Sequence, residues 1–347
     1  MKHLIKLIVL IISFSNLSLI AQVDMNTTGQ GGVDLKQSGK SSMNFLQVGV
    51  SARAAGLGNA YTALSKGVES VFANPAGLTE MESEFEAFVS TTQWFADIKY
   101  LAGAVAWNTE NYGAMALSFI VVDYGSIKGT ALVPKAGTSD NNYILTGDVE
   151  NVGAYSFGLT YVKDISDQFS IGGTAKYVGQ QLGRWTDALG TVNDNKNSRL
   201  AFDMGVKYFP GLESLRLGMS IRNFSTFVSY QSPTVGAPLP LTFAVGAAMN
   251  VLDLVDKDMS KDHSVLVSAE FIHPNNYTDR VNVGIEYTFL NMFSLRGGYE
   301  GNHDVLSWAG GVGVKQTIEG IQFEIDYSYS KALYFDSVNR FGVRIAF

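Results

Sequence analysis

The stretch SARAAGLGNAYTALSKGVESVFANPAGLTEM, Ser51 to Met81, is the long segment near the N-terminus that does not read as β-structure. Its small and apolar residues recur at near-helical spacing, which predicts a helix followed by a second short helical piece at Val68–Phe72. Pro75 removes a backbone donor and biases Asn74 toward an extended conformation, so the helix should stop there. Almost everything from Glu84 to Phe347 alternates strand and turn. A small helical plug before a large β array predicts a barrel with a segment inside it.

The composition is poor in charge. The chain has 347 residues, of which 16% are charged, against about a quarter in a typical soluble domain. A net charge of −7 argues against a nucleic-acid partner. The absence of cysteine excludes disulfides, thiolate metal sites and a lipidated N-terminal cysteine.

The first residues have the pattern of a secretory signal. Lys2 and Lys6 precede the apolar run Leu7–Ile12, and Ala21 stands before Gln22. The alternative is an N-terminal anchor helix, but polar residues interrupt the apolar run too early for a span of about 20 residues. We expect a signal peptide over residues 1–21, an N-terminal extension and hatch over 22–82, and a barrel over 83–347.

The part of the chain after Glu84 predicts about 14 strands. It has no run of about 18 apolar residues without a strong polar break, so its apolar surface must be buried in a soluble β core or face lipid as a barrel. In one segment Phe323, Ile325 and Tyr327 alternate with Glu324 and Asp326, which gives each strand one apolar and one polar face. The polar face would be the wet exterior of a soluble sandwich, or the lumen of a membrane barrel. The expected strands are Glu84–Trp94, Ile98–Asn108, Gly113–Tyr124, Asn151–Lys163, Phe169–Leu182, Arg199–Phe209, Ser214–Asn223, Leu239–Val251, Ser264–Ile272, Arg280–Phe289, Phe293–Glu300, Leu306–Thr317, Ile321–Ser330 and Arg340–Phe347.

Three features favour the membrane barrel over the sandwich. Aromatic residues such as Trp94 and Tyr124 sit at strand ends, where an interface girdle needs them. Connections alternate between short turns and longer polar loops, as in up-and-down outer-membrane barrels. The last strand resembles the C-terminal signal read by the outer-membrane assembly machinery, with apolar residues at Phe341, Val343, Ile345 and Phe347. The expected short turns are Ala96-Asp97, Ser166-Asp167, Gly211-Leu212-Glu213 and Glu319-Gly320, and the expected long loops are Gly125–Glu150, Gly183–Ser198, Phe224–Pro238, Asp253–His263 and Lys331–Asn339.

The N-terminal motif resembles a known family. Ala52–Leu64, ARAAGLGNAYTAL, followed by Asn74–Leu78, NPAGL, is similar to the hatch signature of the FadL superfamily, and most similar to its PorV/PorQ branch. Thr92–Tyr100, Phe169–Tyr177 and Leu215–Asn223 also resemble PorV-like proteins, so the resemblance covers nearly the whole mature chain. It implies an all-β, 14-stranded antiparallel transmembrane barrel in the outer membrane of a Gram-negative bacterium, with a helical hatch in the lumen.

The resemblance implies two functions. PorV proteins serve type IX secretion, where they recognise the C-terminal domain of exported proteins leaving the translocon. FadL proteins pass long-chain fatty acids or other hydrophobic compounds inward. We expect the first, with outer-membrane lipid, the assembly machinery, secreted proteins with type IX C-terminal domains and the translocon as partners. The alternative is a passive transporter of hydrophobic compounds, and a third option is a structural outer-membrane protein without a ligand.

The hatch supplies one set of candidate residues. Small residues let the plug lie close to the barrel wall, and Asn74 before Pro75 suits an Asx-type turn. This Asn-Pro-Ala element either ends a helix or takes part in gating, and the two roles are compatible. The candidate hatch residues are Arg53, Gly56, Gly58, Asn59, Asn74, Pro75 and Ala76.

Charges of both signs recur on the expected lumen face. They could be selectivity filters of a channel, but buried charges must be paired, which favours a salt-bridged network that holds the plug, with Arg53 as a partner. The expected lumen charges are Lys176, Asp203, Lys207, Arg216, Arg222, Glu270, Glu286, Arg296, Glu300, Lys315, Glu324, Asp326 and Arg344.

The sequence gives no catalytic signal. His263, His273 and His303 are isolated and lack metal-ligand spacing. Gly56-x-Gly58 lacks the third glycine and the preceding strand of a dinucleotide-binding motif, and no G-x-S-x-G elbow is present. We therefore expect no enzyme activity, cofactor or metal.

Two loops are candidates for binding a ligand at the extracellular rim. Thr130–Leu145 and Phe224–Pro240 combine aromatic and branched aliphatic residues with Gly, Ser, Thr and Pro. Aromatic anchors in an adaptable polar rim are typical of protein-binding surfaces, although the same residues could line a lipid-capture cleft. The candidate rim residues are Leu132, Tyr143, Phe227 and Tyr230.

Overall fold

A computed structural model describes residues 40–109, 112–132, 143–186, 192–230, 236–255 and 262–347. The expected signal peptide and the first part of the N-terminal extension lie outside the described residues. Among the residues that are described, no helix is long and apolar enough to cross a membrane. The helical elements are η2 (Asn44–Gln47), α2 (Ala52–Gly56), η3 (Gly67–Phe72), η4 (Pro75–Glu80) and α3 (Leu252–Val255).

Fourteen strands form a closed antiparallel barrel, as the sequence predicts. The order around the barrel is sequential, and β1 pairs with β16 to close it, with Glu86 opposite Ala346. Closure satisfies the backbone of every strand, which a structure in hydrocarbon requires. The barrel strands are β1 (Phe85–Gln93), β2 (Lys99–Asn108), β3 (Ala114–Asp123), β6 (Val152–Ser166), β7 (Phe169–Thr186), β8 (Val192–Tyr208), β9 (Arg216–Ser225), β10 (Thr242–Asn250), β11 (His263–Pro274), β12 (Arg280–Phe289), β13 (Phe293–Gly301), β14 (Leu306–Ile318), β15 (Ile321–Ala332) and β16 (Val338–Ala346).

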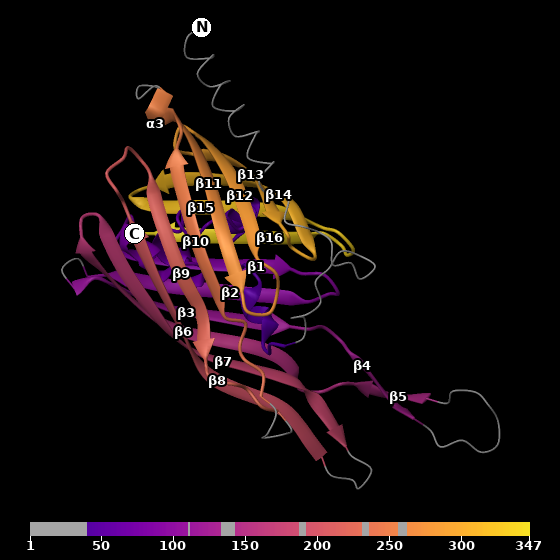
Figure 1. Cartoon of the computed structure of the whole chain (residues 1–347). Helices are drawn as coiled ribbons and strands as arrows, with labels where there is room; N and C mark the ends of the chain where they lie inside the picture. Colours follow the sequence, from indigo (N-terminus) through magenta and orange to yellow (C-terminus); the bar gives the residue numbers. More distant parts are fainter. Residues whose placement is uncertain (1–39, 110–111, 133–142, 187–191, 231–235, 256–261) are drawn as a thin grey trace, which may run out of the picture.

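A separate hairpin, β4 (Lys128–Leu132) and β5 (Tyr143–Asp148), projects from the barrel (Figure 1). It lies within the expected loop Gly125–Glu150. The expected loop Gly183–Ser198 is also mostly strand, because β7 continues to Thr186 and β8 begins at Val192. The sequence predicts both segments as longer polar loops, whereas the structure shows that parts of them pair as strands.

The two ends of the barrel differ in their connections. We call the end where β1 begins and β16 finishes the terminus end, and the opposite end the loop end. The sequence predicts short turns at one end and long loops at the other, and two connections depart from this. The short turn Ala96-Asp97 lies at the loop end. The long connection Asp253–His263 lies at the terminus end. Connections alternate between the ends, so their place follows from strand order and not from their length.

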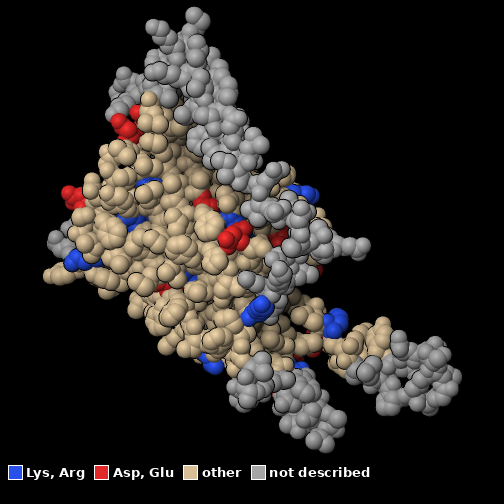
Figure 2. Space-filling model, viewed as in Figure 1, with Lys and Arg blue, Asp and Glu red and all other residues tan. Residues whose placement is uncertain are grey.

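Apolar side chains cover the outside of the barrel. On neighbouring strands Val105, Leu117 and Leu159 are 55%, 60% and 56% exposed, whereas the alternate residues Ala104 and Ala116 are buried. Most of the described surface in Figure 2 is neither acidic nor basic. An apolar exterior around a polar interior is the arrangement of a membrane barrel, and it is the reverse of a soluble sandwich.

We call residues 40–82 the hatch; its helical segments between residues 52 and 80 pack against the barrel wall. Segment α2 packs against β13–β16, η3 against β1–β3, and η4 against β6–β8. The expected helix after Ser51 is only five residues long. Gly58 and Asn59 have φ of 60° and 56°, and this left-handed backbone ends the helix that the small-residue spacing predicts.

Candidate functional site

The expected lumen charges all lie on inward-facing strand positions and are mostly buried. Arg53 of the hatch donates to Glu286, with Nη2 2.7 Å and Nε 3.0 Å from its carboxylate oxygens. Glu286 also accepts from Arg296, which in turn pairs with Asp326. A buried ion network therefore connects the hatch to the wall, as the sequence predicts for Arg53.

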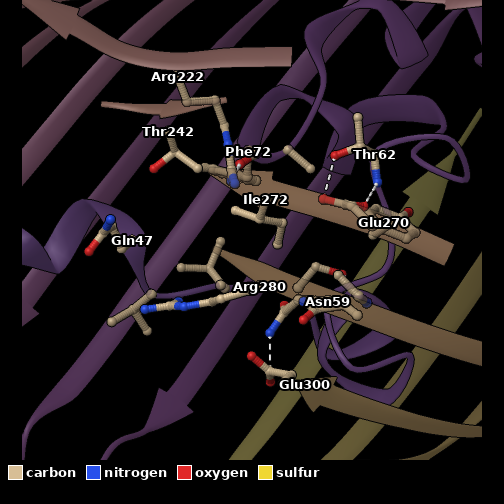
Figure 3. Close-up of a pocket in the computed structure, with 18 of the residues that line it drawn as sticks. Gln47, Asn59, Thr62, Phe72, Arg222, Thr242, Glu270, Ile272, Arg280 and Glu300 are labelled. Carbon is tan, nitrogen blue, oxygen red and sulfur yellow. Dashed lines mark hydrogen bonds between the residues drawn. The ribbon is translucent and has the colours of Figure 1, made fainter. Parts of the chain in front are cut away.

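Two further wall carboxylates hold the hatch. Glu270 accepts from the backbone nitrogen of Thr62 at 2.7 Å and from its hydroxyl at 2.8 Å. Asn59 donates through Nδ2 to Glu300 at 3.0 Å. Figure 3 shows both contacts at the edge of one pocket. Asn59, a predicted hatch residue, thus holds its backbone turn against β13.

The Asn-Pro-Ala element forms an Asx turn, as the sequence predicts. Asn74 Oδ1 accepts from the backbone nitrogen of Ala76 at 3.2 Å, and Asn74 caps η4 with Pro75 in its first turn. The fully buried Asn74 amide also donates to the carbonyls of Thr62 and Val206, at 3.0 Å each. Pro75 therefore begins a short helix as well as following the end of η3 at Phe72.

Wall glycines let the hatch backbone lie close to the strands. A Cβ at Gly298 would fall 2.0 Å from Gly58 N, and one at Gly311 would fall 3.2 Å from Gly56 Cα. The sequence predicts small residues only on the hatch side. Most of the wall glycines that lie against the hatch form cross-strand pairs, and the register between strands brings the two members of each pair together. These pairs are Gly172–Gly205, Gly218–Gly246 and Gly284–Gly298.

Ion pairs close the hatch toward the terminus end. Glu82 lies 2.7 Å from Lys66 Nζ and 2.6 Å from Lys315 Nζ. Glu80 pairs with Lys207 and lies 3.5 Å from Arg216. Glu82 and both of its lysine partners are about a quarter to a third exposed, so these pairs are weaker and more salt-sensitive than the buried Arg53 network. Lys207, the partner of Glu80, is fully buried.

A small cavity between the hatch and the wall forms what we call the inner chamber (Figure 3). Its volume is about 90 Å³. Buried polar atoms without a hydrogen-bond partner line it: Nε of Arg222 and of Arg280, Nη2 of Arg340 and Oδ1 of Asn282. Buried polar groups normally have partners, so these atoms mark a place for water or for the polar end of a ligand.

A larger cavity of about 530 Å³ opens at the loop end, and we call it the vestibule. Hatch residues 41–45, 47 and 48 form one side. Aromatic side chains from the barrel line the rest, together with Gln180, Leu182, Arg280, His303, Asp304 and Val305. Gln47, Val48, Trp94, Arg280 and His303 line both the vestibule and the inner chamber, and we call these five residues the neck. The aromatic lining consists of Phe45, Trp94, Phe95, Tyr100, Tyr124 and Tyr277.

His303 is a neutral donor at the neck. Its Nδ1 accepts from the backbone nitrogens of Val305 and Leu306, at 3.1 and 3.0 Å, so the proton of the neutral ring sits on Nε2. Burial, followed by the nearby guanidinium groups of Arg280 and Arg340, lowers the pKa of His303 to about 3. The sequence shows His303 only as an isolated histidine.

The candidate rim residues do not form one surface. Tyr143 on β5 and Phe227 are 63% and 65% exposed. Tyr230 is half-buried instead, because its hydroxyl bonds Gln180 at 3.1 Å and the hatch hydroxyl of Ser42 at 2.9 Å. Leu132 pairs with Tyr143 in the projecting hairpin.

The residues of the expected assembly signal all lie on the outward face of β16 or just after it. Phe341 and Phe347 are 45% and 57% exposed, and Val343 and Ile345 are half-buried. Phe347 stacks on Phe85 with ring centroids 5.8 Å apart, and the two residues exchange backbone hydrogen bonds at 2.9 Å. These contacts close the seam between the first and last strands.

Metal-ligating residues do not gather in the described part of the chain, where no group of three or more His, Asp or Glu could hold an ion.

Comparison with sequence families and with curated proteins gives no match. Solved structures do match. The toluene transporter TbuX of Ralstonia pickettii aligns with a TM-score of 0.54 at 14% identity, over 86% of this chain and 97% of that one. The toluene transporter TodX of Pseudomonas putida gives 0.53 at 10%, over 86% and 97%. A Pseudomonas aeruginosa FadL homologue gives 0.51 at 11%, over 85% and 97%.

These likenesses concern the fold. The chain shares the barrel fold of these three proteins, one of which is a FadL homologue, over nearly the full length of the matched chains. The PorV resemblance of the hatch motif adds a finer distinction that these matches do not address.

Proposed function

We propose that the barrel captures small hydrophobic or amphipathic molecules at the loop end and passes them across the outer membrane. The observation that carries this proposal is the vestibule, an open cavity in which six aromatic rings lie beside polar side chains and which shares the neck residues with the inner chamber. Cavities that combine aromatic side chains with placed polar groups are typical of sites for small amphipathic molecules. The fold shared with two barrels described as toluene transporters supports the same class of function.

Arg280 is the residue we assign to the polar end of such a ligand. Its guanidinium stacks over Tyr277 at 5.2 Å, and its Nε has no partner. Among the described residues, no carboxylate forms an ion pair with it within 4.0 Å, in contrast to Arg53 and Arg296. A carboxylate at the neck would complete its hydrogen bonding, while an alkyl or aryl tail would lie among the aromatic rings.

Onward passage requires part of the hatch to move, because the hatch fills the lumen beyond the inner chamber. The terminus end is the part suited to move, since the partly exposed pairs of Glu82 hold it. The Arg53 network is buried and fixes α2 more firmly. We therefore place the movable part in residues 67–82.

Calorimetric titration of the barrel in lipid nanodiscs tests the binding step. Wild-type protein should bind both dodecanoate and 1-dodecanol. Arg280→Met should weaken dodecanoate about tenfold, the effect of losing one charge-assisted hydrogen bond, and leave dodecanol nearly unchanged. Arg184→Met is the matched control, because Arg184 pairs with Asp194 outside the cavity. Absence of binding by either probe, or equal loss for both probes in Arg280→Met, would contradict the assignment.

A second proposal is recognition of exported proteins in type IX secretion, which the PorV resemblance of the hatch motif motivates. The observation that favours it is the projecting hairpin, where Tyr143, Ile144 and Leu145 are 63%, 55% and 67% exposed. A lone two-stranded sheet is marginally stable and suited to gain stability from a partner. Deleting the 224–240 loop or residues 128–148 should then remove a secreted protein that copurifies with the barrel, and copurification that survives both deletions would count against it.

A further inference from the structure

We infer that Arg340 couples occupancy of the inner chamber to the hatch, so that a ligand reaching past the neck tightens the hatch at Gly49. This inference rests on the proposed binding of small molecules in the vestibule. It adds a regulatory role to a residue that the candidate sets omit.

Arg340 joins the neck to the hatch backbone. Its side chain, 1% exposed, extends inward from β16. Nε donates to the carbonyl of Gly49 at 2.8 Å, and Nη1 donates to Ser330 Oγ at 3.0 Å. The guanidinium also lies over the ring of Trp94, 5.6 Å from its centroid, and Trp94 belongs to the neck. One planar group therefore touches the hatch, the wall and the ligand cavity.

The contact at Gly49 reaches the next turn of the hatch. A Cβ at Gly49 would fall 2.7 Å from Asn59 Oδ1, so the segment at Gly49 lies directly against Asn59. Asn59 in turn donates to Glu300 on β13. Loss of the hydrogen bond from Arg340 to Gly49 would therefore let Asn59 shift as well. The backbone turn at Asn59 ends α2.

The remaining nitrogen of Arg340 is Nη2, and Arg340 is one of the residues that line the inner chamber. Nη2 is buried without a hydrogen-bond partner. An acceptor oxygen close to Nη2 would complete the hydrogen bonding of the guanidinium. It would favour the orientation in which Nε donates to the carbonyl of Gly49. A ligand that favours one arrangement raises its population, and by linkage the same arrangement binds the ligand more tightly.

Arg222 provides a matched comparison. It also extends from the wall toward the inner chamber with an unpartnered Nε, but it donates to the carbonyl of Phe72 at 3.3 Å instead of to Gly49. Its removal changes the charge of the chamber without touching the Gly49 contact.

The test combines calorimetric titration with hydrogen exchange on the whole barrel in lipid nanodiscs, with dodecanoate as the probe. In wild-type protein, dodecanoate should slow exchange of the amides in residues 48–60 about tenfold, the factor for one charge-assisted hydrogen bond. Arg340→Met should raise their exchange about tenfold without ligand and should abolish the ligand effect. Arg222→Met should keep the ligand effect at residues 48–60.

Each outcome has a distinct meaning. Unchanged ligand-free exchange in Arg340→Met, or a full dodecanoate effect in that variant, would overturn the coupling. Dodecanoate that binds wild-type protein without slowing exchange at residues 48–60 would overturn the coupling alone and leave the proposed function standing. If dodecanoate does not bind at all, the proposed function fails and the coupling fails with it. The heat-dependent gel shift of a folded barrel confirms that each variant is assembled.

Discussion

Gly205 on β8 lies directly against Asn74 of the hatch, where a Cβ at position 205 would fall 1.9 Å from Asn74 Oδ1. Asn74 is fully buried, and its amide bonds the carbonyl of Val206 next to this glycine. The side chain of Asn74 therefore occupies the space that the missing side chain of Gly205 leaves at the wall. The fit holds the hatch close to the wall where η4 begins.

Gly205→Ala should loosen the hatch because the new methyl group displaces Asn74. We expect a loss of about 1–3 kcal/mol in the free energy of unfolding, as for other overpacked sites, and faster proteolysis of residues 67–82. Gly310→Ala is the control, because its Cβ would meet only an ordinary contact of 3.7 Å with the carbonyl of Arg296. Equal stability of the two variants would refute the close-fit interpretation.

Phe347→Ser should impair assembly of the barrel more than removal of any single loop charge. Phe347 stacks on Phe85 at the closing seam, and an unclosed edge leaves unpaired backbone groups in hydrocarbon. The measurement is the amount of heat-modifiable protein in the outer-membrane fraction, with Lys128→Met as the loop-charge control. Wild-type levels of Phe347→Ser in that fraction would show that the terminal aromatic is dispensable.

Glu286→Gln should destabilise the barrel more than Arg53→Met. Neutralising Glu286 leaves two buried guanidinium groups without their shared carboxylate, at a cost of about 3–5 kcal/mol. Removing Arg53 leaves Glu286 paired with Arg296, so the cost should be smaller. Lys128→Met, which breaks an exposed pair with Asp148, should cost about 0–1 kcal/mol. Chemical unfolding in detergent measures all three, and the reverse order of the first two would contradict the shared-carboxylate arrangement.

Glu69 should make the hatch less stable as the pH rises. Burial, together with the nearby carboxylates of Asp326 and Glu324, raises the pKa of Glu69 to about 7 from an ordinary value of 4.5. The folded state therefore binds more protons than the unfolded state between about pH 4.5 and 7, so stability falls across that window and levels off above it. The unfolding midpoint against pH should show this fall, and Glu69→Gln should flatten it. An unchanged slope in Glu69→Gln would assign the effect to other groups.

The fold follows from the sequence because its signals are local and repeated. Period-two alternation, as in Phe323–Tyr327, predicts each strand, and the count of 14 fixes the closed barrel. The helix expected after Ser51 is shorter than predicted. Small residues at helical spacing are also compatible with a turn, so their spacing does not show where the helix ends. Its end depends on left-handed backbone at Gly58 and Asn59, which the wall contacts at Tyr299 and Glu300 stabilise.

The candidate site is only partly visible in the sequence. Arg53 and Asn74 belong to a recognisable motif. Their partners on the wall can be identified only once the pairing of the strands is known. Arg280, His303 and Arg340 come from three separate strands or turns, and nothing local distinguishes them from other polar residues of the lumen. Only the folded chain shows that they meet at one cavity and which of their nitrogens lack partners.

Analysis of what copurifies with the barrel from its native envelope tests the central claim most directly. Gentle extraction followed by mass spectrometry of both the small molecules and the proteins would identify the contents. We predict a hydrophobic or acid-headed small molecule in the wild-type protein, reduced in Arg280→Met and retained in Arg184→Met. A preparation that carries a stoichiometric secreted protein and no small molecule would contradict the claim and favour the protein-shuttle function instead.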